Sequence, residues 1–234
     1  MSSNTFNQLF ATQAKLNSTD LFTLKVGVHT LSDQLHRLSK RLLDVIVAFT
    51  AMVLLLPVFF GAITTIKLTS PGSAFFKQTR VGKNGKPFQL WKFRSMYLDA
   101  EQRKQDLMAL NDLENNLLFK MKNDPRITPI GQFIRKYSID ELPQLINVLK
   151  GDMTLVGPRP AVPGEVSKYT EYQSQRLMAV PGITCIWQVT GRSNIPFEQQ
   201  VELDLQYIKQ SSLLLDIKLL LLTIPAVLTA RGAY

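Results

Sequence analysis

Residues 45–66 read VIVAFTAMVLLLPVFFGAITTI, a run without a single charged side chain. At about 1.5 Å per residue, a helix of this length would measure about 33 Å, close to the ~30 Å hydrocarbon thickness of a bilayer. A buried core helix is the alternative, but helices of soluble proteins seldom stay apolar over such a length. The segment therefore predicts contact with a membrane.

Pro57 lies near the middle of this segment, where a proline removes a hydrogen bond and bends or breaks a helix. The halves, residues 45–56 and 58–66, would each reach about halfway across the bilayer. Basic residues flank both ends: His36, Arg37, Lys40 and Arg41 precede the segment, and Lys67, Lys77 and Arg80 follow it. Because basic flanks favour the cytoplasmic side, we expect a helix that enters, turns at Pro57 and leaves on the same face. A kinked spanning helix stays open as the alternative.

Composition narrows the class of protein. The 234 residues are 45% hydrophobic, which excludes a disordered chain. The one cysteine, Cys185, cannot form an internal disulfide, and no Cys/His spacing resembles a zinc site. A net charge of +9 favours an anionic partner, with nucleic acid, a phospholipid surface and a phosphorylated substrate as the alternatives.

The residues after the apolar segment predict a β-hairpin and then a helix. Apolar and aromatic residues flank Asn84 and Gly85, a dipeptide suited to the positive φ angles of a type I′ turn. An apolar stripe predicts a helix over residues 99–122, which ends before Pro125.

Near the C-terminus, residues 213–222 form a second dense apolar stretch, which Pro225 interrupts. It is too short to cross a bilayer, so a core helix and a helix in the membrane interface are equally open. Together these elements predict an α+β, mainly helical fold. It would contain a re-entrant membrane helix-hairpin, a small β-hairpin and interfacial amphipathic helices.

Two adjacent carboxylates, Asp140 and Glu141, lie at the start of a helix predicted over residues 138–149. Ser138 and Glu141 fit a capping box, in which each side chain binds the backbone N–H of the other. Asp140 would then only complement the helix dipole. Catalysis is the competing interpretation, because carboxylates beside cations at a helix start suit a divalent metal, a pyrophosphate and an aspartyl nucleophile.

Neighbouring cations favour catalysis over capping. Arg135 lies just upstream of the pair, and Arg159 lies downstream in the sequence Gly157-Pro158-Arg159-Pro160. The prolines hold the Arg159 backbone extended, and a guanidinium on a stiff loop binds phosphate at a small entropic cost. A cluster of surface salt bridges is the alternative.

Three more cations are candidate phosphate or sugar contacts. Lys92 and Arg94 alternate with aromatic residues, which predicts that both lie on one strand face. Arg192 is isolated, so for it a solvated charge is the favoured alternative. Residues 181–184 are expected to form a turn.

These segments resemble the bacterial sugar transferases, the monotopic phosphoglycosyl transferases that act on polyprenol phosphate. The resemblance runs from about residue 37 to the end and leaves the first 36 residues uncovered. It is specific because many motifs occur in order. They are Lys40-Arg41 with Asp44, Lys92-Phe93-Arg94-Ser95-Met96, Asp124-Pro125-Arg126-Ile127-Thr128, residues 135–149, Gly151-Asp152-Met153, residues 157–160, residues 181–192 and Arg231-Gly232-Ala233-Tyr234.

The resemblance implies transfer of a sugar 1-phosphate from a nucleotide sugar, expected to be a UDP-sugar, to undecaprenyl phosphate, with release of the nucleoside monophosphate. In the family, the aspartate of the Asp-Glu pair attacks the β-phosphate and forms a covalent phosphosugar intermediate; that position is Asp140 here. The glutamate, Glu141 here, binds Mg²⁺. The matching arginines, Arg135 and Arg159, would contact phosphate groups.

The family's re-entrant helix matches residues 45–66, although its break is often Ser-Pro where this chain has Leu56 and Pro57. Cys185 stands where the family often has glycine, which bears on a local turn and not on the chemistry. The expected organisation is a poorly defined tail over residues 1–36, a re-entrant membrane helix over 37–67 and a cytoplasmic and interfacial catalytic domain over 68–234.

The expected location is the cytoplasmic face of the bacterial inner membrane, in the short form of the family used in exopolysaccharide or capsule assembly. Expected partners are the nucleotide sugar, polyprenol phosphate and membrane phospholipid, without nucleic acid; a homodimer is left open. A nucleic-acid-binding protein would explain the charge of +9 but not the apolar run. A non-catalytic membrane scaffold for glycan assembly would explain the hairpin but gives Asp140, Glu141 and Arg159 no role.

Overall fold

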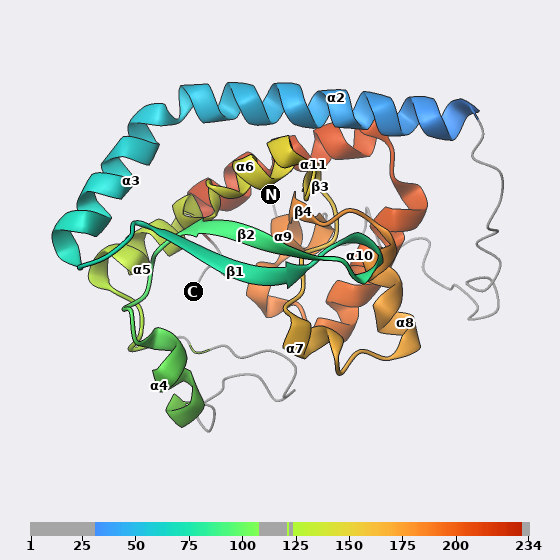
Figure 1. Ribbon diagram of the computed structural model, residues 1–234. Helices are drawn as coiled ribbons and strands as arrows, with labels where there is room; N and C mark the ends of the chain where they lie inside the picture. The colour runs from blue at the N-terminus through green and yellow to red at the C-terminus, as the bar shows by residue number, and fades with distance from the viewer. Residues whose placement is uncertain (1–30, 108–120, 122–123, 231–234) are drawn as a thin grey trace. The chain divides into compact units, whose positions relative to one another are not determined.

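The computed structural model describes residues 31–107, 121 and 124–230 (Figure 1). The chain divides into two compact units, residues 1–39 and residues 40–234. Of the first unit, the described part is residues 31–39, the start of helix α2. In chain order the helices, 3₁₀ turns (η) and strands are α2 (Leu31–Leu54), α3 (Leu56–Thr69), β1 (Phe75–Val81), η2 (Lys83–Gly85), β2 (Pro87–Phe93), α4 (Ala100–Leu107), α5 (Pro129–Lys136), η4 (Ile139–Glu141), α6 (Gln144–Lys150), β3 (Thr154–Val156), α7 (Pro163–Val166), α8 (Glu171–Ser174), η5 (Gln175–Met178), β4 (Gly182–Thr184), α9 (Ile186–Thr190), η6 (Arg192–Asn194), α10 (Phe197–Gln210) and α11 (Leu213–Thr229).

Helices dominate these elements, and the described strands form two small two-stranded sheets. The predicted α+β, mainly helical fold class is confirmed. Strands β1 and β2 form the expected antiparallel hairpin. Asn84 and Gly85 have positive φ angles of 56° and 78°, and the Lys86 N–H donates to Lys83 O across them at 3.3 Å. The predicted turn at Asn84-Gly85 is therefore present. It lies within a connection of five residues between the two strands.

Helices α2 and α3 meet at a sharp bend. The segments Gln34–Leu54 and Leu56–Thr69 are inclined by 60°, and Leu55 between them has φ −91° and ψ 5°. Pro57 lies in the first turn of α3, where its missing N–H has no helical partner to lose. No single helix in the described residues is long and apolar enough to cross a bilayer. The bent pair has the length and composition of a broken span or a re-entrant loop.

The inner faces of α2 and α3 pack on the rest of the second unit. Phe59 and Ile66 of α3 are buried in a cluster with Phe93 of β2. The rings of Phe59 and Phe93 meet edge-on, with centroids 5.3 Å apart. Ala48 of α2 lies fully buried in a second cluster with residues of β2, β3, α6, α9, α10 and α11. Both helices are therefore anchored to the remainder of this unit by apolar contacts.

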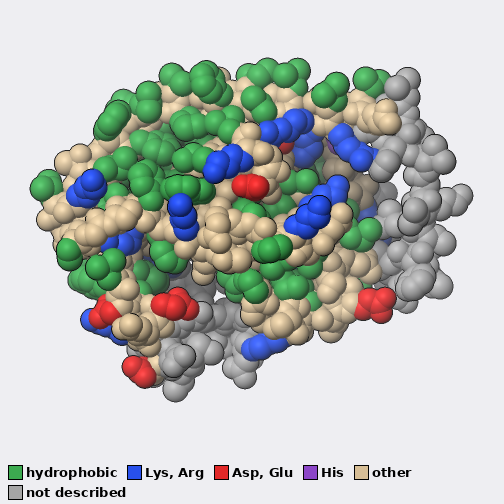
Figure 2. Space-filling view, viewed as in Figure 1, with side chains coloured by type: hydrophobic (Ala, Val, Ile, Leu, Met, Phe, Trp, Pro, Cys, Tyr) green, Lys and Arg blue, Asp and Glu red, His purple; other side chains and the backbone are tan. Residues whose placement is uncertain are grey.

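The outer faces of α2 and α3 expose large apolar side chains. Figure 2 shows hydrophobic side chains along the edge that these helices form. Exposed apolar patches of this extent mark interaction or membrane surfaces. The exposed residues of this surface in the second unit are Leu42, Ile46, Phe49, Val53, Leu54, Leu56, Val58, Phe60 and Leu68.

Residues 213–222 were open to two interpretations, a core helix or a helix in the membrane interface. They form the first part of helix α11, which has one buried face and one exposed apolar face. Asp216 and Leu219 are buried, so one side belongs to the core. The helix continues through Pro225 to its end at Thr229, so the predicted interruption is wrong; the proline is accommodated inside the helix. The other side exposes Leu214, Ile217, Leu221, Ile224 and Leu228.

Two further predictions each concern one short segment of the chain. The helix expected over residues 99–122 begins as α4, and the part of it over residues 108–120 and 122–123 lies outside the described residues. The turn expected over residues 181–184 is wrong, because Gly182–Thr184 is strand β4, parallel to β3. The strands approach so closely that a Cβ at Gly182 would lie 2.1 Å from the backbone nitrogen of Gly157.

Candidate active site

A cavity of about 1540 Å³ opens in the second unit. Its walls come from α3, the β1–β2 hairpin, the segment before α6, the loop after β3, and α9 to α11. Every predicted catalytic and phosphate-binding residue lines it, whereas Pro57, the predicted membrane break, is not part of the wall. These residues are Lys92, Arg94, Arg135, Asp140, Glu141, Arg159 and Arg192.

The segment that carries the two carboxylates is not the start of a regular helix. Ser138 has a left-handed backbone, with φ 55° and ψ 21°, and its side chain makes no capping hydrogen bond. The Glu141 N–H binds the Ser138 carbonyl oxygen and not its hydroxyl, which forms the 3₁₀ turn η4. Helix α6 begins only at Gln144. The capping-box alternative is therefore wrong, and both carboxylates are available to other partners.

Lys92 of β2 lies between the two carboxylates. Its ammonium donates to Glu141 Oε1 at 2.9 Å and lies 3.6 Å from Asp140 Oδ2. The Arg159 guanidinium approaches the same Glu141 oxygen at 3.8 Å. Because only 10% of the Asp140 side chain and 20% of the Glu141 side chain are exposed, these charges are poorly screened by water.

The two carboxylates have different acidities. Burial alone would raise the pKa of Glu141, but the charges of Lys92 and Arg159 outweigh it and lower that pKa to about 2. Burial raises the pKa of Asp140; the Glu141 charge adds to this, while Lys92 and Arg135 oppose it. Glu141 is therefore firmly ionised, and Asp140 is the more basic carboxylate of the pair.

The remaining predicted cations lie at different places in the cavity wall. Arg135 is in the last turn of α5, and its charge acts on Asp140. Arg192 begins η6 with a positive φ of 51°, and the Glu141 charge acts on it. Arg94 donates to Ser70 O at 2.9 Å and to the carbonyl oxygen of the next residue at 2.5 Å. Lys92 and Arg94 both line the cavity but bind different partners: Lys92 contacts the carboxylates, and Arg94 contacts the backbone that follows α3.

Sequence reasoning missed the role of Arg80, which it considered only as a flanking charge. Arg80 is buried, and its guanidinium donates to Pro160 O at 2.9 Å, beside Arg159. Burial and the Arg159 charge lower the pKa of Arg80 to about 10. Arg80 thereby fixes the Arg159 loop to β1. No local signal marks this role, because the partner lies 80 positions further along the chain.

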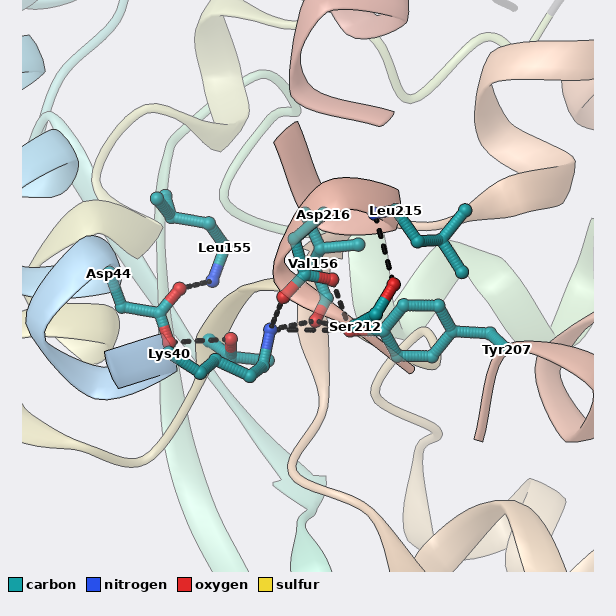
Figure 3. A network of polar contacts seen from close by, with 9 residues as sticks. Lys40, Asp44, Leu155, Val156, Tyr207, Ser212, Leu215 and Asp216 are labelled. Carbon is teal, nitrogen blue, oxygen red and sulfur yellow. Dashed lines mark hydrogen bonds and ion pairs between the residues drawn. The ribbon is translucent and has the colours of Figure 1, made fainter. Parts of the chain in front are cut away.

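A buried polar network connects α2 to β3, the strand that precedes the Arg159 loop (Figure 3). The Lys40 ammonium donates to Asp216 Oδ2 at 2.6 Å and to Val156 O at 3.1 Å. The Tyr207 hydroxyl lies 2.7 Å from Asp216 Oδ1 and 2.8 Å from the same Val156 oxygen. Helices α2, α10 and α11 therefore meet at the end of β3, three residues before Arg159.

Asp44, one turn after Lys40, makes a second connection to the same strand. Its carboxylate accepts hydrogen bonds from Thr154 Oγ1 at 2.6 Å and from the Leu155 N–H at 2.9 Å. Arg41 donates to the carbonyl oxygens of two residues near the end of α6, at 2.5 and 2.8 Å. These contacts explain why α2, whose second half is apolar, contains the charged residues Lys40, Arg41 and Asp44 at its base, the part that precedes residue 45.

A second buried ion pair includes Arg176, which also lines the cavity. The Arg176 guanidinium donates to Asp204, and both side chains are almost fully buried. Arg176 also lies over the rings of Tyr169 and Phe197, at 5.9 and 5.6 Å from their centroids. Burial raises the pKa of Asp204, although the Arg176 charge opposes that shift. No local sequence pattern indicated this pair, whose members lie 28 positions apart.

The carboxylates of Asp140 and Glu141 are the residues best suited to hold a metal. In the part of the chain that the structure describes, no group of three or more His, Cys, Asp and Glu side chains forms a metal site by itself. Mg²⁺ is usually bound through one or two carboxylates together with the phosphates of a substrate. Two adjacent carboxylates on a cavity wall fit this shared mode of binding.

The chain is similar to several known proteins over most of its length. The chain is 49% identical over 199 residues to the galactosyl transferase CpsE of Streptococcus agalactiae serotype III, covering 85% of this chain and 44% of that protein. It is 36% identical over 240 residues to the UDP-glucose:undecaprenyl-phosphate glucose-1-phosphate transferase of Escherichia coli, covering 98% and 48%. It is 38% identical over 200 residues to the exopolysaccharide production protein ExoY of Sinorhizobium fredii, covering 84% and 88%.

The chain therefore spans about half the length of the first two relatives and most of the third. The family model described as bacterial sugar transferase matches residues 35–230, from the base of α2 to the end of α11. Because that match covers most of the chain and includes both carboxylates and every cation of the cavity wall, the protein belongs to the bacterial sugar transferase family.

Proposed function

We propose that the protein transfers a sugar 1-phosphate from a UDP-sugar to undecaprenyl phosphate and releases UMP. The observation that carries this proposal is the Asp140–Glu141 pair, which faces Lys92 and Arg159 in a cavity of about 1540 Å³. The printed name of the Escherichia coli relative, with its UDP-glucose donor and undecaprenyl-phosphate acceptor, supports the two substrate classes. The reaction would be a first membrane step of exopolysaccharide, capsule or O-antigen assembly.

Asp140 is the proposed nucleophile. One oxygen of its carboxylate forms a bond to the β-phosphorus of the donor. The bond from that phosphorus to the bridging oxygen breaks, and UMP leaves with the electron pair. The phosphate of the lipid acceptor then attacks the same phosphorus and frees Asp140. The raised pKa of Asp140, against the lowered pKa of Glu141, supports this choice, because the more basic carboxylate is the better nucleophile.

The cations of the cavity would lower the energy of bringing phosphorylated substrates to a carboxylate. Arg159 lies on a loop held by Arg80, so its guanidinium is positioned before a substrate arrives. Arg135 and Arg192 line the same cavity. Fixed positive groups of this kind stabilise the charge that develops on transferred phosphoryl groups.

We include Mg²⁺ in the proposal. Glu141, and Asp140 before it reacts, would hold the ion together with donor phosphates, and the ion would neutralise negative charge on the phosphate oxygens. The low pKa of Glu141 supports this role, because a ligand of a hard cation has to be ionised at neutral pH.

Helices α2 and α3 are proposed to enter the inner membrane from the cytoplasmic side as a re-entrant hairpin. The bend of 60° and the exposed apolar side chains support the hairpin, and the basic residues that flank it support entry from the cytoplasmic side. Leu55 and Val58, next to the bend, are part of the cavity wall. A lipid acceptor lying beside the hairpin would therefore reach the cavity that contains Asp140 without leaving the membrane surface.

The test uses the protein purified in detergent or nanodiscs with undecaprenyl phosphate and Mg²⁺. We expect release of UMP from at least one member of a panel of UDP-sugars, together with a lipid-linked sugar diphosphate. The same preparation with Asp140→Asn should release none. Absence of nucleotide release from every sugar nucleotide would contradict the proposal and favour a membrane scaffold.

A further inference from the structure

Lys92 occupies the place between the carboxylates that a divalent cation would need. In the described part of the chain it supplies the one hydrogen bond to the Glu141 carboxylate, and it is also within ion-pair distance of Asp140. Only 17% of its side chain is exposed. A second cation on these oxygens would be repelled by an ammonium a few ångströms away with little water to screen it.

The strand fixes the backbone of Lys92, so any movement of the ammonium has to come from its long side chain. In β2, Lys92 pairs with Phe76 of β1. The adjacent Trp91 N–H donates to Asn147 Oδ1 at 3.0 Å, and the Asn147 amide donates back to Gln89 O at 2.7 Å. The four-carbon stem of a lysine can then swing its ammonium between nearby acceptors, which a rigid arginine fork does less readily.

We propose that Lys92 is an exchangeable counter-cation of the Asp140–Glu141 pair: a divalent cation binds these carboxylates by displacing the Lys92 ammonium, which turns to the phosphates of the donor. This inference rests on the proposed function for the identity of the cation and of the donor. In this exchange the ammonium leaves carboxylate oxygens and binds phosphate oxygens.

The exchange has a consequence for the order of binding. Without a donor, the displaced ammonium has no anion to receive it, so metal binding to the free protein is weak. A donor phosphate supplies that anion, so donor and metal strengthen each other's binding, as linkage requires. Lys92 would thereby prevent the carboxylates from holding a metal before the sugar nucleotide is present.

The experiment titrates the purified protein with Mn²⁺ alone and measures free Mn²⁺ by electron paramagnetic resonance. We expect Lys92→Met to bind Mn²⁺ at least about tenfold more tightly than the wild type, because the competing charge is gone. Lys77→Met is the matched control: Lys77 lies on β1 over the ring of Trp91, 4.1 Å from its centroid, and should leave Mn²⁺ affinity unchanged. The double variant Lys92→Met/Glu141→Gln should lose the gain, which locates the ion.

Equal or weaker Mn²⁺ binding by Lys92→Met would overturn the inference, as would a gain that survives Glu141→Gln. If Lys92→Met is unstable because two buried carboxylates face each other, Mn²⁺ should raise its melting temperature more than that of the wild type. Lys92→Gln provides the same comparison with a polar side chain. Failure of Mn²⁺ to stabilise either variant would count against the exchange.

This measurement is separable from the proposed function. A wild-type protein that transfers no sugar phosphate would defeat the proposed function, yet the Mn²⁺ titration would still report whether Lys92 competes for the carboxylates. An active enzyme whose Lys92→Met variant gains no Mn²⁺ affinity would defeat the exchange alone.

Discussion

The Lys40 ammonium lies 2.6 Å from Asp216 Oδ2, an ion pair between residues 176 positions apart that joins the base of α2 to α11 (Figure 3). Only 1% of the Asp216 side chain is exposed, so the Lys40 ammonium and the Tyr207 hydroxyl take the place of water around the carboxylate. Lys40 also donates to Val156 O, at the strand end that leads to Arg159. The helix proposed to enter the membrane is thus connected, through this side chain among others, to the strand that precedes Arg159 in the cavity wall.

Lys40→Met should lower the free energy of unfolding by about 3–5 kcal/mol, because it leaves a buried carboxylate without its cation. Lys40→Met/Asp216→Asn should recover part of that loss, since the unpaired charge is then absent. Lys209→Met, at an exposed lysine of α10, is the control and should stay within about 0.5 kcal/mol of the wild type. Denaturant unfolding in detergent measures all three, and a Lys40→Met protein as stable as the control would contradict the role of the ion pair.

The features that could be predicted from the sequence depend on residues that are close together in the chain. The Asn84-Gly85 turn is such a case, because positive φ angles are favoured by these two residue types themselves. The apolar run with Pro57 likewise gave the bent helix pair, although the bend lies at Leu55 and the proline begins the second helix. The residue types of the site, two carboxylates and several cations, could also be selected before their positions were known.

The features that were missed depend on partners distant in the chain. Lys92 donates to Glu141 across 49 positions, and Arg80 reaches Pro160 across 80. Ser138 and Glu141 fitted a capping box, but a left-handed backbone at Ser138 formed a 3₁₀ turn in its place. Local propensity describes such segments wrongly whenever tertiary contacts supply a better partner than the neighbouring backbone.

The two ends of the bent helix pair should lie on one side of the membrane. Single cysteines at Arg37 and Lys77, both exposed residues, should react with an impermeant maleimide from the same side of sealed vesicles. Cys185 is buried, and the unmodified chain gives the background labelling. Pro57→Leu should weaken the break and shift some molecules toward a crossing helix. If the two positions are labelled from opposite sides in the chain that retains Pro57, the segment is a spanning helix.

The acid limb of kcat/KM should lie above the pH expected of an ordinary aspartate. Asp140 has to be ionised to attack, and burial raises its pKa above the usual 3.8. Activity is then lost as the pH falls through the raised pKa. Because the Lys92 charge lowers that pKa, Lys92→Gln should move the limb to still higher pH. The measurement is the rate of UMP release against pH, and a limb that Lys92→Gln moves downward would contradict this electrostatic arrangement.

Glu141→Gln should lower the rate sharply and weaken the dependence on Mg²⁺, because a neutral amide is a poor ligand for a hard cation. The comparison is turnover at increasing Mg²⁺, with a chelator as the zero point. Glu165→Gln is a matched control, since Glu165 also lines the cavity but belongs to α7 and not to the carboxylate pair. Full activity of Glu141→Gln in the presence of the chelator would remove the metal role from this residue.

Asp140→Asn separates covalent catalysis from a structural role of this carboxylate. The η4 turn keeps its backbone hydrogen bond from the Glu141 N–H to Ser138 O without the Asp140 side chain, so the variant should fold. Its turnover should nearly vanish, because an amide does not form an acyl phosphate. Asp106→Asn, at an exposed position of α4, is the control and should retain full activity.

The covalent route also predicts an intermediate that can be weighed. Wild-type protein given a UDP-sugar without lipid acceptor should release UMP and gain the mass of one sugar phosphate, because the first half-reaction needs no acceptor. Adding undecaprenyl phosphate should remove that mass, and Asp140→Asn should never acquire it. Since Glu141 lies next in the chain and is also ionised, peptide mapping of the adduct decides between them. An adduct on Glu141, or an Asp140→Asn enzyme that turns over at the wild-type rate, would show that the more basic carboxylate is not the nucleophile.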